Sequence, residues 1–515
     1  MSRGWRIALL VGVAFGLALR CYIFFVQAPT LWQDEAYWAV KALKTEAIDA
    51  QIRPLGFMLI TQLLLRTFGA AAWVYRIQPF LGGLLAMGLA PYVARRLFQK
   101  PWSQLLAVLL LAVSPVALEM CAEFKHYGTE IGAYVGVLAA LLRHQERPSW
   151  RTLALVLGAA WCAFFVSITI IFLYPALFGM LSWQAYRGKR WRELMAITGV
   201  VFICLGSITT IYFTTWRGIS ANKAENKWGT WYDVFYLKNG LKTTHDSRFT
   251  WTAAKYFELG AVPGIDRELW RPTRISEPSL ERLKVADIWL WAALHVLGLA
   301  WLARQRRYLE LLVLWSPLLL LTAFNLAGRW PAGAFRSNTF YVPFAIFIAC
   351  AAAEWLPDEK PVQRRLAFGL AGVLLLSTLV FRPSLTRKGL WAKPGAFTEA
   401  LALLPRNPAR GQRALLMDFE SCRPWDYYTA YDVPFSNIGP GLRRRYDKQC
   451  ERTGIKLKRS IAQLQRSQPD GFKILLTDPR KFEDMEDLVK QVCAKSTVTY
   501  VRGRTHQLSS CIGRK

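Results

Sequence analysis

Long uninterrupted apolar runs constrain the fold of this 515-residue chain more than any other feature. A helix that crosses a hydrocarbon core about 30 Å thick needs about 20 predominantly apolar residues. Such runs, separated by short charged clusters, recur from residue 7 to residue 382. We therefore expect a polytopic membrane protein, although the length alone would allow roughly three globular domains.

The charge pattern predicts eleven spans with the amino terminus inside. Residues 54–68 are set apart as a juxtamembrane helix in the interface, because Gln62 and Arg66 share one helix face. The short basic clusters then all fall on the inner side, as the positive-inside rule requires. A signal peptide ending near Ala28 is the alternative for the first run, which is long for one. The expected spans are 6–26, 74–94, 102–118, 127–142, 152–167, 169–186, 194–214, 286–303, 308–327, 339–356 and 366–382.

The uncharged run at residues 152–186 is too long to be one span. As a single helix it would measure about 52 Å at about 1.5 Å per residue, well beyond the bilayer core. We expect it to fold back on itself as two short spans.

The remaining segments lie outside the membrane in this topology. We expect a transmembrane domain at residues 1–385, with outer loops at 27–73 and 215–285, and an extracytoplasmic soluble α/β domain at 386–515. In the latter, RALLMDF and FKILLTD have the pattern of buried strands and RKFEDMEDLVKQVCAK that of a helix. An even number of cysteines in such a domain predicts two disulfides among Cys422, Cys450, Cys493 and Cys511.

The formal charge of +30 does not indicate a nucleic-acid partner. Many of the Lys and Arg residues stand in short loops between spans, where they set topology. The sequence contains no zinc finger, RNA-recognition aromatic motif or DNA-reading helix. The membrane itself is the expected partner.

The stretch QAPTLWQDEAYWAVKAL (residues 27–43) places Asp34 and Glu35 between Trp32 and Tyr37, directly after the first span. Two explanations need no chemistry: the acids could form the first turn of a helix, and the aromatic rings could belong to a headgroup belt. The functional interpretation is a carboxylate that acts as a general base, with rings that stack on a sugar.

A second polar stretch, SPVALEMCAEFKHYGTE (residues 114–130), carries Glu123, Lys125 and Tyr127 at the same outer rim. A solvated loop with an ion pair is the alternative explanation. Arg336 lies outside, against the positive-inside bias, and its planar fork suits phosphate oxygens. Arg53 precedes the interfacial helix, where snorkelling of the side chain is the alternative explanation. Acids and cations near the lipid boundary fit a lipid-linked phosphate as leaving group and a hydroxyl as acceptor.

The order of these signals resembles the GT-C membrane glycosyltransferases of the protein-mannosyltransferase-like group, which includes glycosyltransferase family 39, aminoarabinose transferases and rhizobial lipopolysaccharide-core transferases. Residues 5–385 carry the resemblance. The motifs, in order, are WQDEAYW, RPLGFMLITQLLLRTFG, VYRIQPFLGGLLA with YVARRLF, SPVALEMCAEFKHYG, FVSITIIFLYPALF and FRSNTFYVPF.

The resemblance implies an enzyme that transfers a hexosyl or pentosyl group from a polyprenyl-phosphate donor to a hydroxyl on the extracytoplasmic face, usually with inversion. Asp34 matches the proposed general base, and Glu35 its companion. Arg53 stands where the family usually has Lys or Pro before its conserved proline. Lys125 replaces the arginine of a Glu-x-Arg-x-Tyr pattern and so loses the bidentate fork. The implied phosphate contacts are Arg53, Lys125 and Arg336, and the implied donor or acceptor pocket is Trp32, Tyr37, Glu123 and Tyr127.

The resemblance also bears on cofactors and location. Some members bind zinc through a glutamate that precedes the juxtamembrane lysine, but here that position is Ile52. We therefore predict no required metal, with a divalent ion as the open alternative; the lipid-linked sugar is the co-substrate. The implied location is the inner (plasma) membrane, in glycan biosynthesis of the cell envelope such as lipopolysaccharide, with a glycan, lipid or protein as acceptor.

Two other classes of function remain open at this point. A transporter or flippase of lipid-linked sugars would have inverted repeats and ionisable residues at mid-membrane. The charged residues instead lie mostly at span ends, with Arg20 nearest to an exception. A membrane-anchored binding or assembly protein would work through the carboxy-terminal domain and would not need Asp34.

Overall fold

A computed structural model describes chiefly residues 2–27, 33–43, 54–211, 277–327 and 335–355, together with the strand segments 414–418, 447–451, 472–476, 493–501 and 506–513. The chain divides into two compact units. Unit 1 comprises Met1–Phe24, Ile48–Ile60 and Arg76–Pro383, and unit 2 comprises Phe25–Ala47, Thr61–Tyr75 and Ser384–Lys515. Each unit is described by itself below.

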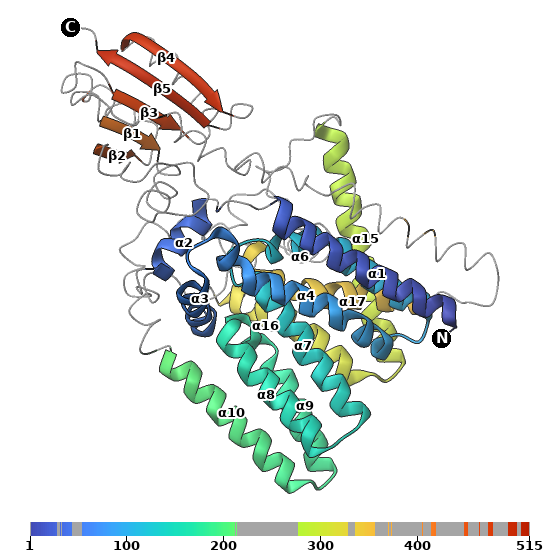
Figure 1. Ribbon diagram of the computed structural model, residues 1–515. Helices are drawn as coiled ribbons and strands as arrows, with labels where there is room; N and C mark the ends of the chain where they lie inside the picture. Colours follow the sequence, from blue (N-terminus) through green and yellow to red (C-terminus); the bar gives the residue numbers. More distant parts are fainter. Residues whose placement is uncertain are drawn as a thin grey trace. The chain divides into compact units, whose positions relative to one another are not determined.

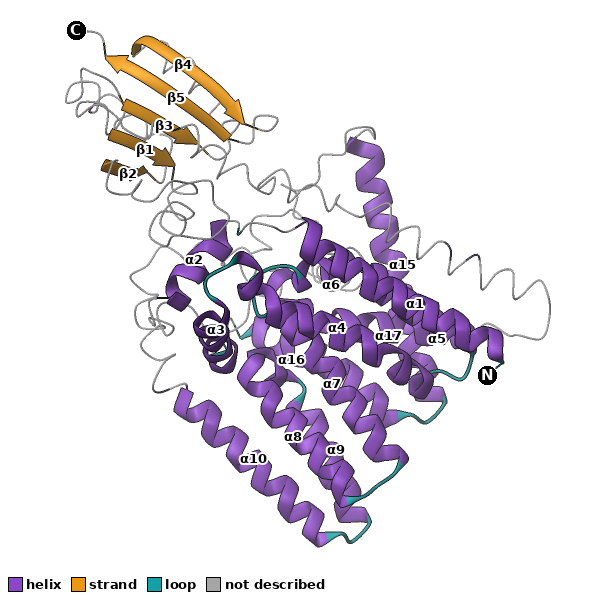
Figure 2. Ribbon diagram, viewed as in Figure 1, coloured by secondary structure: helices purple, strands orange, loops and turns teal. Residues whose placement is uncertain are grey.

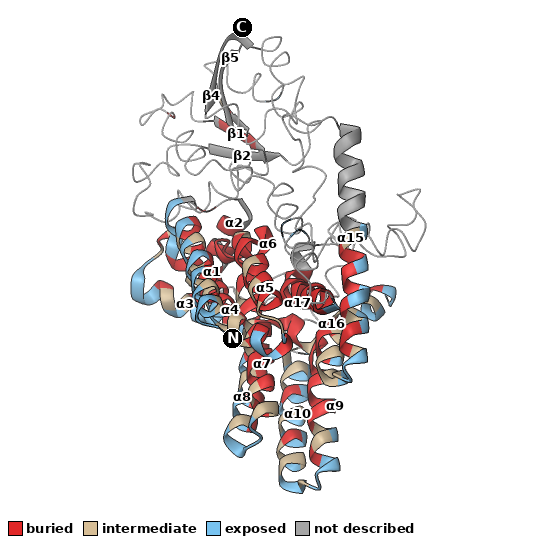
Figure 3. Cartoon of the chain, turned by 90° about the vertical axis from the view of Figure 1, so that its right-hand side faces the viewer, coloured by how far each residue is buried: buried red, intermediate tan, exposed pale blue. Residues whose placement is uncertain are grey.

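Unit 1 is a bundle of helices (Figures 1 and 2). Helix α1 packs along α5, α7 packs along α8, and α15 packs along α17. Helices α5 and α17 are almost wholly buried, whereas α10 exposes most of its surface (Figure 3). The described helices of unit 1, including the first turns of α3, are α1 (Arg3–Tyr22), α3 (Leu55–Phe68), α4 (Ala72–Leu97), α5 (Pro101–Val113), α6 (Pro115–Cys121), α7 (Tyr127–Glu146), α8 (Trp150–Val166), α9 (Tyr174–Arg187), α10 (Trp191–Ile211), α15 (Glu277–Arg304), α16 (Tyr308–Leu326) and α17 (Val342–Ala352).

Helices are found at ten of the eleven expected spans, and the eleventh, 366–382, lies almost entirely outside the described residues. Within the described part of the chain, five helices are long and apolar enough to cross a membrane, and a bent pair makes a sixth. The run Trp191–Ile211 has a mean hydropathy of 2.2 with only 11% of its window buried, as a lipid-facing helix would have. The predicted juxtamembrane segment is indeed helical, as α3.

The prediction that the run at 152–186 folds as two helices is confirmed. Helix α8 ends at Val166, and a 3-10 helix, η2 (Ile168–Phe172), separates it from α9. The amino end of α8 is closed by a capping box between Ser149 and Thr152, which satisfies two backbone donors reciprocally.

Helices α5 and α6 together form one broken span, with a bend of 49° at Ser114. The break follows from Pro115, which has no backbone N–H and disfavours a helical conformation for the residue before it. The hydroxyl oxygen of Ser114 then caps α6 by accepting a hydrogen bond from the amide of Ala117. The chain reaches the α6–α7 connection through this break.

Unit 2 contains helix α2 (Gln33–Leu43), the last turns of α3, and a five-stranded sheet of order β2-β1-β3-β5-β4. Parallel pairing joins β1 (Ala414–Asp418) to β2 (Asp447–Glu451) and to β3 (Phe472–Leu476). Strand β5 (His506–Gly513) pairs antiparallel with β3 and with β4 (Cys493–Val501). The two predicted strands are present as β1 and β3.

The helix predicted at residues 480–495 is wrong at its carboxy-terminal end. The expected helix RKFEDMEDLVKQVCAK cannot reach Lys495, because Cys493 already begins β4. The β-branched residues Thr497, Val498 and Thr499 explain this outcome, since such side chains favour extended backbone. The remainder of that helix and the predicted disulfides lie outside the described residues and side chains.

Candidate functional site

Asp34 and Glu35 occupy the first turn of helix α2, in unit 2. The Glu35 side chain is fully buried, so it is not a solvated acid at a helix end. Helix α2 is held within its unit by Gln62 of α3, whose amide nitrogen donates to the carbonyl of Ala42 at 3.4 Å. The side chains of Asp34 and Tyr37, and all of Trp32, lie outside what the structure describes.

The second polar stretch lies in the connection between α6 and α7, in unit 1. Glu123 and Lys125 are 4% and 6% exposed, and the amide of Lys125 donates to the carbonyl of Glu123 at 2.7 Å. This burial excludes the solvated-loop explanation for the stretch. Charged groups held inside a membrane protein are costly and therefore mark functional sites by default.

The start of α3 packs on this connection. The Phe57 ring stacks on Phe124 with centroids 5.8 Å apart and meets the His126 ring edge-on at 6.3 Å. The carbonyl of Phe57 accepts a hydrogen bond from the Gln78 side chain of α4 at 2.9 Å. Arg53 lies outside the described residues, four positions before Phe57 in the sequence.

Glu130, in the first turn of α7, forms the centre of a buried polar cluster. Its Oε1 accepts hydrogen bonds from the hydroxyls of Thr169 at 3.0 Å and Ser167 at 3.3 Å. His126 Nε2 lies 3.8 Å from the same oxygen. The other oxygen, Oε2, is buried without a hydrogen-bond partner among the described residues. The cluster joins the α6–α7 connection to the break between α8 and α9.

Glycines set the position of α7 against α4. A Cβ placed on Gly132 would lie 2.5 Å from the carbonyl oxygen of Gly82, and one on Gly128 would lie 2.7 Å from that of Pro79. The sequence Gly128-Thr-Glu-Ile-Gly132 is a small-xxx-small pattern, which lets two helix backbones approach closely. Glu130 therefore lies on a helix whose backbone is in close contact with that of α4.

A further 3-10 helix, η4 (Phe335–Tyr341), carries Arg336. Its residue Phe340 stacks on Tyr134 of α7 with centroids 4.9 Å apart, and the Tyr134 hydroxyl donates to the carbonyl of Thr169. The backbone that carries Arg336 is thus packed against the same helix as Glu130. The structure does not describe the Arg336 side chain.

Of the residues predicted from sequence, the structure thus brings Glu123 and Lys125 together on one buried connection, with the half-buried Tyr127 directly after it at the start of α7. It describes the helix of Asp34 and Glu35 separately, in the other unit. Sequence reasoning placed His126 and Glu130 at the rim without a role, and it missed Ser167 and Thr169. The only signal for the latter pair was their polarity inside an otherwise apolar run.

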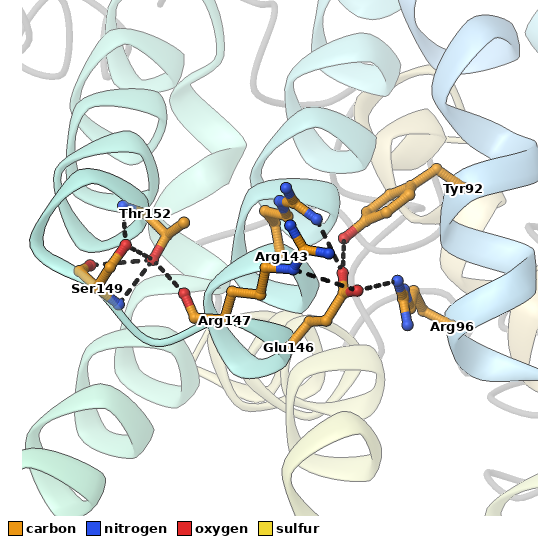
Figure 4. A network of polar contacts seen from close by, with 7 residues as sticks. All are labelled: Tyr92, Arg96, Arg143, Glu146, Arg147, Ser149 and Thr152. Atoms are coloured by element: carbon orange, nitrogen blue, oxygen red, sulfur yellow. Dashed lines mark hydrogen bonds and ion pairs between the residues drawn. The ribbon is translucent and has the colours of Figure 1, made fainter.

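The opposite end of α7 carries a different ionic cluster (Figure 4). Glu146 lies 2.5 Å from Arg96, 3.1 Å from Arg143 and 4.0 Å from Arg147. Desolvation raises the pKa of Glu146. The hydrogen bond from Arg143 and the three positive charges outweigh it, so the pKa lies below its ordinary value. Because Glu130 and Glu146 are 16 positions apart in α7, about 24 Å of helix separate this cluster from Glu130. The Glu146 cluster is therefore a structural element and no part of the candidate site.

Among the described residues no group of three or more His, Cys, Asp and Glu side chains could hold a metal ion. The buried set around Glu130 offers one carboxylate and one imidazole, fewer than the three protein ligands of ordinary catalytic metal sites. The prediction that no metal is required stays a prediction.

Comparison with known proteins identifies the fold. Residues 52–213, less than half of the chain, match the family described as dolichyl-phosphate-mannose-protein mannosyltransferase. The crystal structure of ArnT from Cupriavidus metallidurans in the apo state is 14% identical, covers 98% of this chain and 99% of its own, and has a TM-score of 0.51. The same protein bound to undecaprenyl phosphate is 13% identical over the full length of both chains, also with a TM-score of 0.51.

The archaeal oligosaccharyltransferase AglB from Archaeoglobus fulgidus, in complex with an inhibitory peptide and a dolichol-phosphate, is 12% identical and covers 95% of this chain and 71% of its own, with a TM-score of 0.44. No curated protein matches the sequence. The resemblance to GT-C glycosyltransferases that the sequence motifs indicated is confirmed by the family match and by the shared fold with ArnT.

Proposed function

We propose that this chain, with the GT-C fold of ArnT, transfers a sugar from a polyprenyl-phosphate donor to an acceptor hydroxyl on the extracytoplasmic face of the membrane. The observation that carries the proposal is the burial of Glu123, Lys125, His126 and Glu130 at one end of a helical bundle. Ionisable side chains in such a place need a functional reason. The ArnT structure bound to undecaprenyl phosphate supports a lipid phosphate as the ligand.

In the proposed reaction, Asp34 accepts the proton of the acceptor hydroxyl as general base. The hydroxyl oxygen attacks the anomeric carbon of the donor sugar, and the bond from that carbon to the phosphate oxygen breaks. The sugar is transferred with inversion, and the polyprenyl phosphate leaves with the bonding electron pair. Glu35 orients the base or the sugar.

The negative charge that develops on the leaving phosphate needs cations. Lys125, the buried cation of the α6–α7 connection, is the first of these, with Arg53 and Arg336 as further contacts. A preorganised cation in a site of low dielectric stabilises developing charge far better than one in water. Trp32, Tyr37, Glu123 and Tyr127 form the proposed pocket for the sugar and the acceptor.

The chain is proposed to reside in the inner membrane, with residues 386–515 on the same side as the site. Transport or flipping of lipid-linked sugars is the second candidate function. It is supported by the same buried charges, but it would need no general base, so Asp34 separates the two proposals.

The test is sugar transfer by membranes that contain wild type or Asp34→Asn, with a panel of polyprenyl-phosphate sugars and envelope acceptors. Asp34→Asn keeps the shape of the side chain and removes the base. We expect a loss of at least about 100-fold, in the range that a positioned general base contributes. Glu193→Gln is the matched control, since Glu193 pairs with Arg190 at 2.9 Å at the start of α10 and has no proposed role in the reaction.

Transfer by wild type and by Glu193→Gln, with loss in Asp34→Asn at equal folded protein levels, supports the proposal. An unchanged rate in Asp34→Asn refutes the general base. Flipping of a labelled lipid-linked sugar in proteoliposomes, without transfer and equally in both variants, establishes transport as the function.

A further inference from the structure

Arg20 of helix α1 is a fully buried cation that the proposed reaction does not use. Its guanidinium donates hydrogen bonds to three backbone carbonyls: Leu111 at 2.9 Å, Gly16 at 3.0 Å and Ala112 at 3.4 Å. Gly16 is one turn earlier in the same helix. Leu111 and Ala112 belong to the last turn of α5, which is more than 90 positions along the chain.

The carbonyls of Leu111 and Ala112 are acceptors that the break after α5 leaves without helical donors. In an unbroken helix, the carbonyl of Leu111 would accept from the amide of residue 115. That residue is proline, which has no amide hydrogen, and the bend at Ser114 removes the next donor as well. An unsatisfied backbone carbonyl in a membrane interior costs several kcal/mol. The guanidinium of Arg20 supplies the missing donors.

The carboxy-terminal end of α5 also provides a partial negative charge beside the Arg20 guanidinium. A helix carboxyl end carries about half a negative charge, and a cation beside it is stabilised. Within the described part of the chain, no carboxylate pairs with Arg20, and its buried Nε has no acceptor. A Cβ placed on Gly83 of α4 would lie 3.5 Å from this Nε and 2.6 Å from the Cβ of Cys121. Helices α4, α5 and α6 therefore all lie beside the guanidinium.

The α5–α6 break, whose carbonyl groups bond to Arg20, comes shortly before the candidate site in the chain. Helix α6 is only seven residues long, and the connection with Glu123 and Lys125 begins immediately after it. A short helix has little stability of its own, so its direction depends on tertiary contacts. The contact between α1 and the end of α5 helps to fix the point from which α6 begins.

We propose that Arg20 is a positioning residue, whose guanidinium holds the α5–α6 break in the geometry that presents Lys125 to the donor phosphate. The link to Lys125 rests on the proposed glycosyl transfer. The local role at the break does not, and it can be measured in protein that transfers nothing.

The first measurement is hydrogen exchange of peptides from residues 114–127 in purified full-length protein. Arg20→Met, which keeps length and apolar volume but removes the donors, should raise exchange in these peptides about tenfold or more over wild type. Arg3→Met, at the exposed start of α1, is the control and should leave them unchanged. Arg20→Lys should give an intermediate result, because one nitrogen cannot reach both carbonyls.

The second measurement separates positioning from stability. In Arg20→Met with Pro115→Ala, the new amide can bond to the carbonyl of Leu111, so exchange in the segment should fall again. Transfer should stay about tenfold or more below wild type in kcat, because the helix no longer breaks where the site requires it. Recovery of transfer in this double variant, or unchanged exchange in Arg20→Met, overturns the proposal. If wild type transfers no sugar, the glycosyl-transfer proposal fails, and exchange alone still decides the role of Arg20.

Discussion

Thr169 donates a hydrogen bond to Glu130 at 3.0 Å, although the two residues are 39 positions apart in the sequence. Thr169 lies in the short 3-10 helix η2 that separates α8 from α9, and Glu130 lies in the first turn of α7. Both side chains are buried. The contact joins the amino-terminal end of α7 to the break between α8 and α9.

Thr169→Val should lower the free energy of unfolding by about 1 kcal/mol. The exchange preserves shape but removes one of two donors to a buried carboxyl group, and an unmatched buried acceptor costs about 1–3 kcal/mol. Side-chain hydrogen bonds in membrane proteins average about 0.6 kcal/mol, so the lower part of that range applies. Denaturant titration of the purified protein measures the difference. Thr67→Val, in which an exposed hydroxyl bonds only the carbonyl of Leu63, should change nothing measurable. Equal effects in the two variants would refute the buried contact.

Gly132→Ala should destabilise the bundle by about 1–3 kcal/mol, because the new Cβ meets the backbone of Gly82 at 2.5 Å and neither helix can yield without moving. Gly136→Ala lies one turn further along α7, where the nearest atom is 3.9 Å away, and should be neutral or slightly stabilising, since alanine favours helix. Thermal unfolding of both variants in the same detergent compares them. A stable Gly132→Ala variant would contradict the close approach of α4 and α7.

Lys125→Met should reduce sugar transfer by roughly 100-fold, the usual cost of removing one preorganised group that stabilises developing charge. Lys125→Arg restores the charge and the family's residue at this position, so it should recover at least part of the loss. Steady-state rates with a purified lipid-linked donor measure both, at matched protein levels. The proposed phosphate contact is wrong if methionine and arginine give the same rate.

The Glu146 cluster should make the unfolding temperature depend on pH. The pKa of Glu146 in the folded chain lies below its ordinary value of 4.5, so the cluster stabilises the fold above that pH. The contribution disappears as the pH falls through the lowered pKa. Wild type should therefore exceed Glu146→Gln in unfolding temperature at pH 7, and the difference should shrink as the pH falls below 4.5 and Glu146 becomes protonated. A difference independent of pH would show that the ion pairs do not cause it.

Removal of divalent ions with a chelator should leave sugar transfer intact. The described part of the chain brings no three metal-ligating side chains together. Transfer before and after chelation, with the same membranes, measures this. Complete loss that returns only on addition of one metal would establish a metal requirement.

The local features of the fold could be predicted from the sequence because the bilayer imposes a simple length rule. The run at 152–186 had to break because one helix of that length would not fit, and it does break at Ile168–Phe172. The helix at 54–68 followed from its own apolar face. The last three residues of the helix predicted at 480–495 were wrong, because β4 begins at Cys493 and its β-branched residues Thr497, Val498 and Thr499 pair with β5.

The polar contacts of the site could be predicted only in part. Glu123, Lys125 and Tyr127 are close in sequence, so a motif could find them. The partners of Glu130 depend on how α7 packs against the break after α8, and nothing in the local pattern determines such a tertiary contact. The role of Arg20 has the same origin, because its acceptors exist only where Pro115 interrupts a distant helix.

Helices α8 and α9 have 17 and 14 residues, which correspond to about 26 Å and 21 Å. A hydrocarbon core about 30 Å thick is longer than either of them, so this side of the bundle has a hydrophobic mismatch with an average bilayer. Trp150, Trp183 and Tyr186, at the ends of these helices, are exposed and suited to the headgroup level. A span shorter than the core is accommodated by local thinning of the bilayer or by snorkelling of flanking side chains, so we expect one of these adjustments beside α8 and α9.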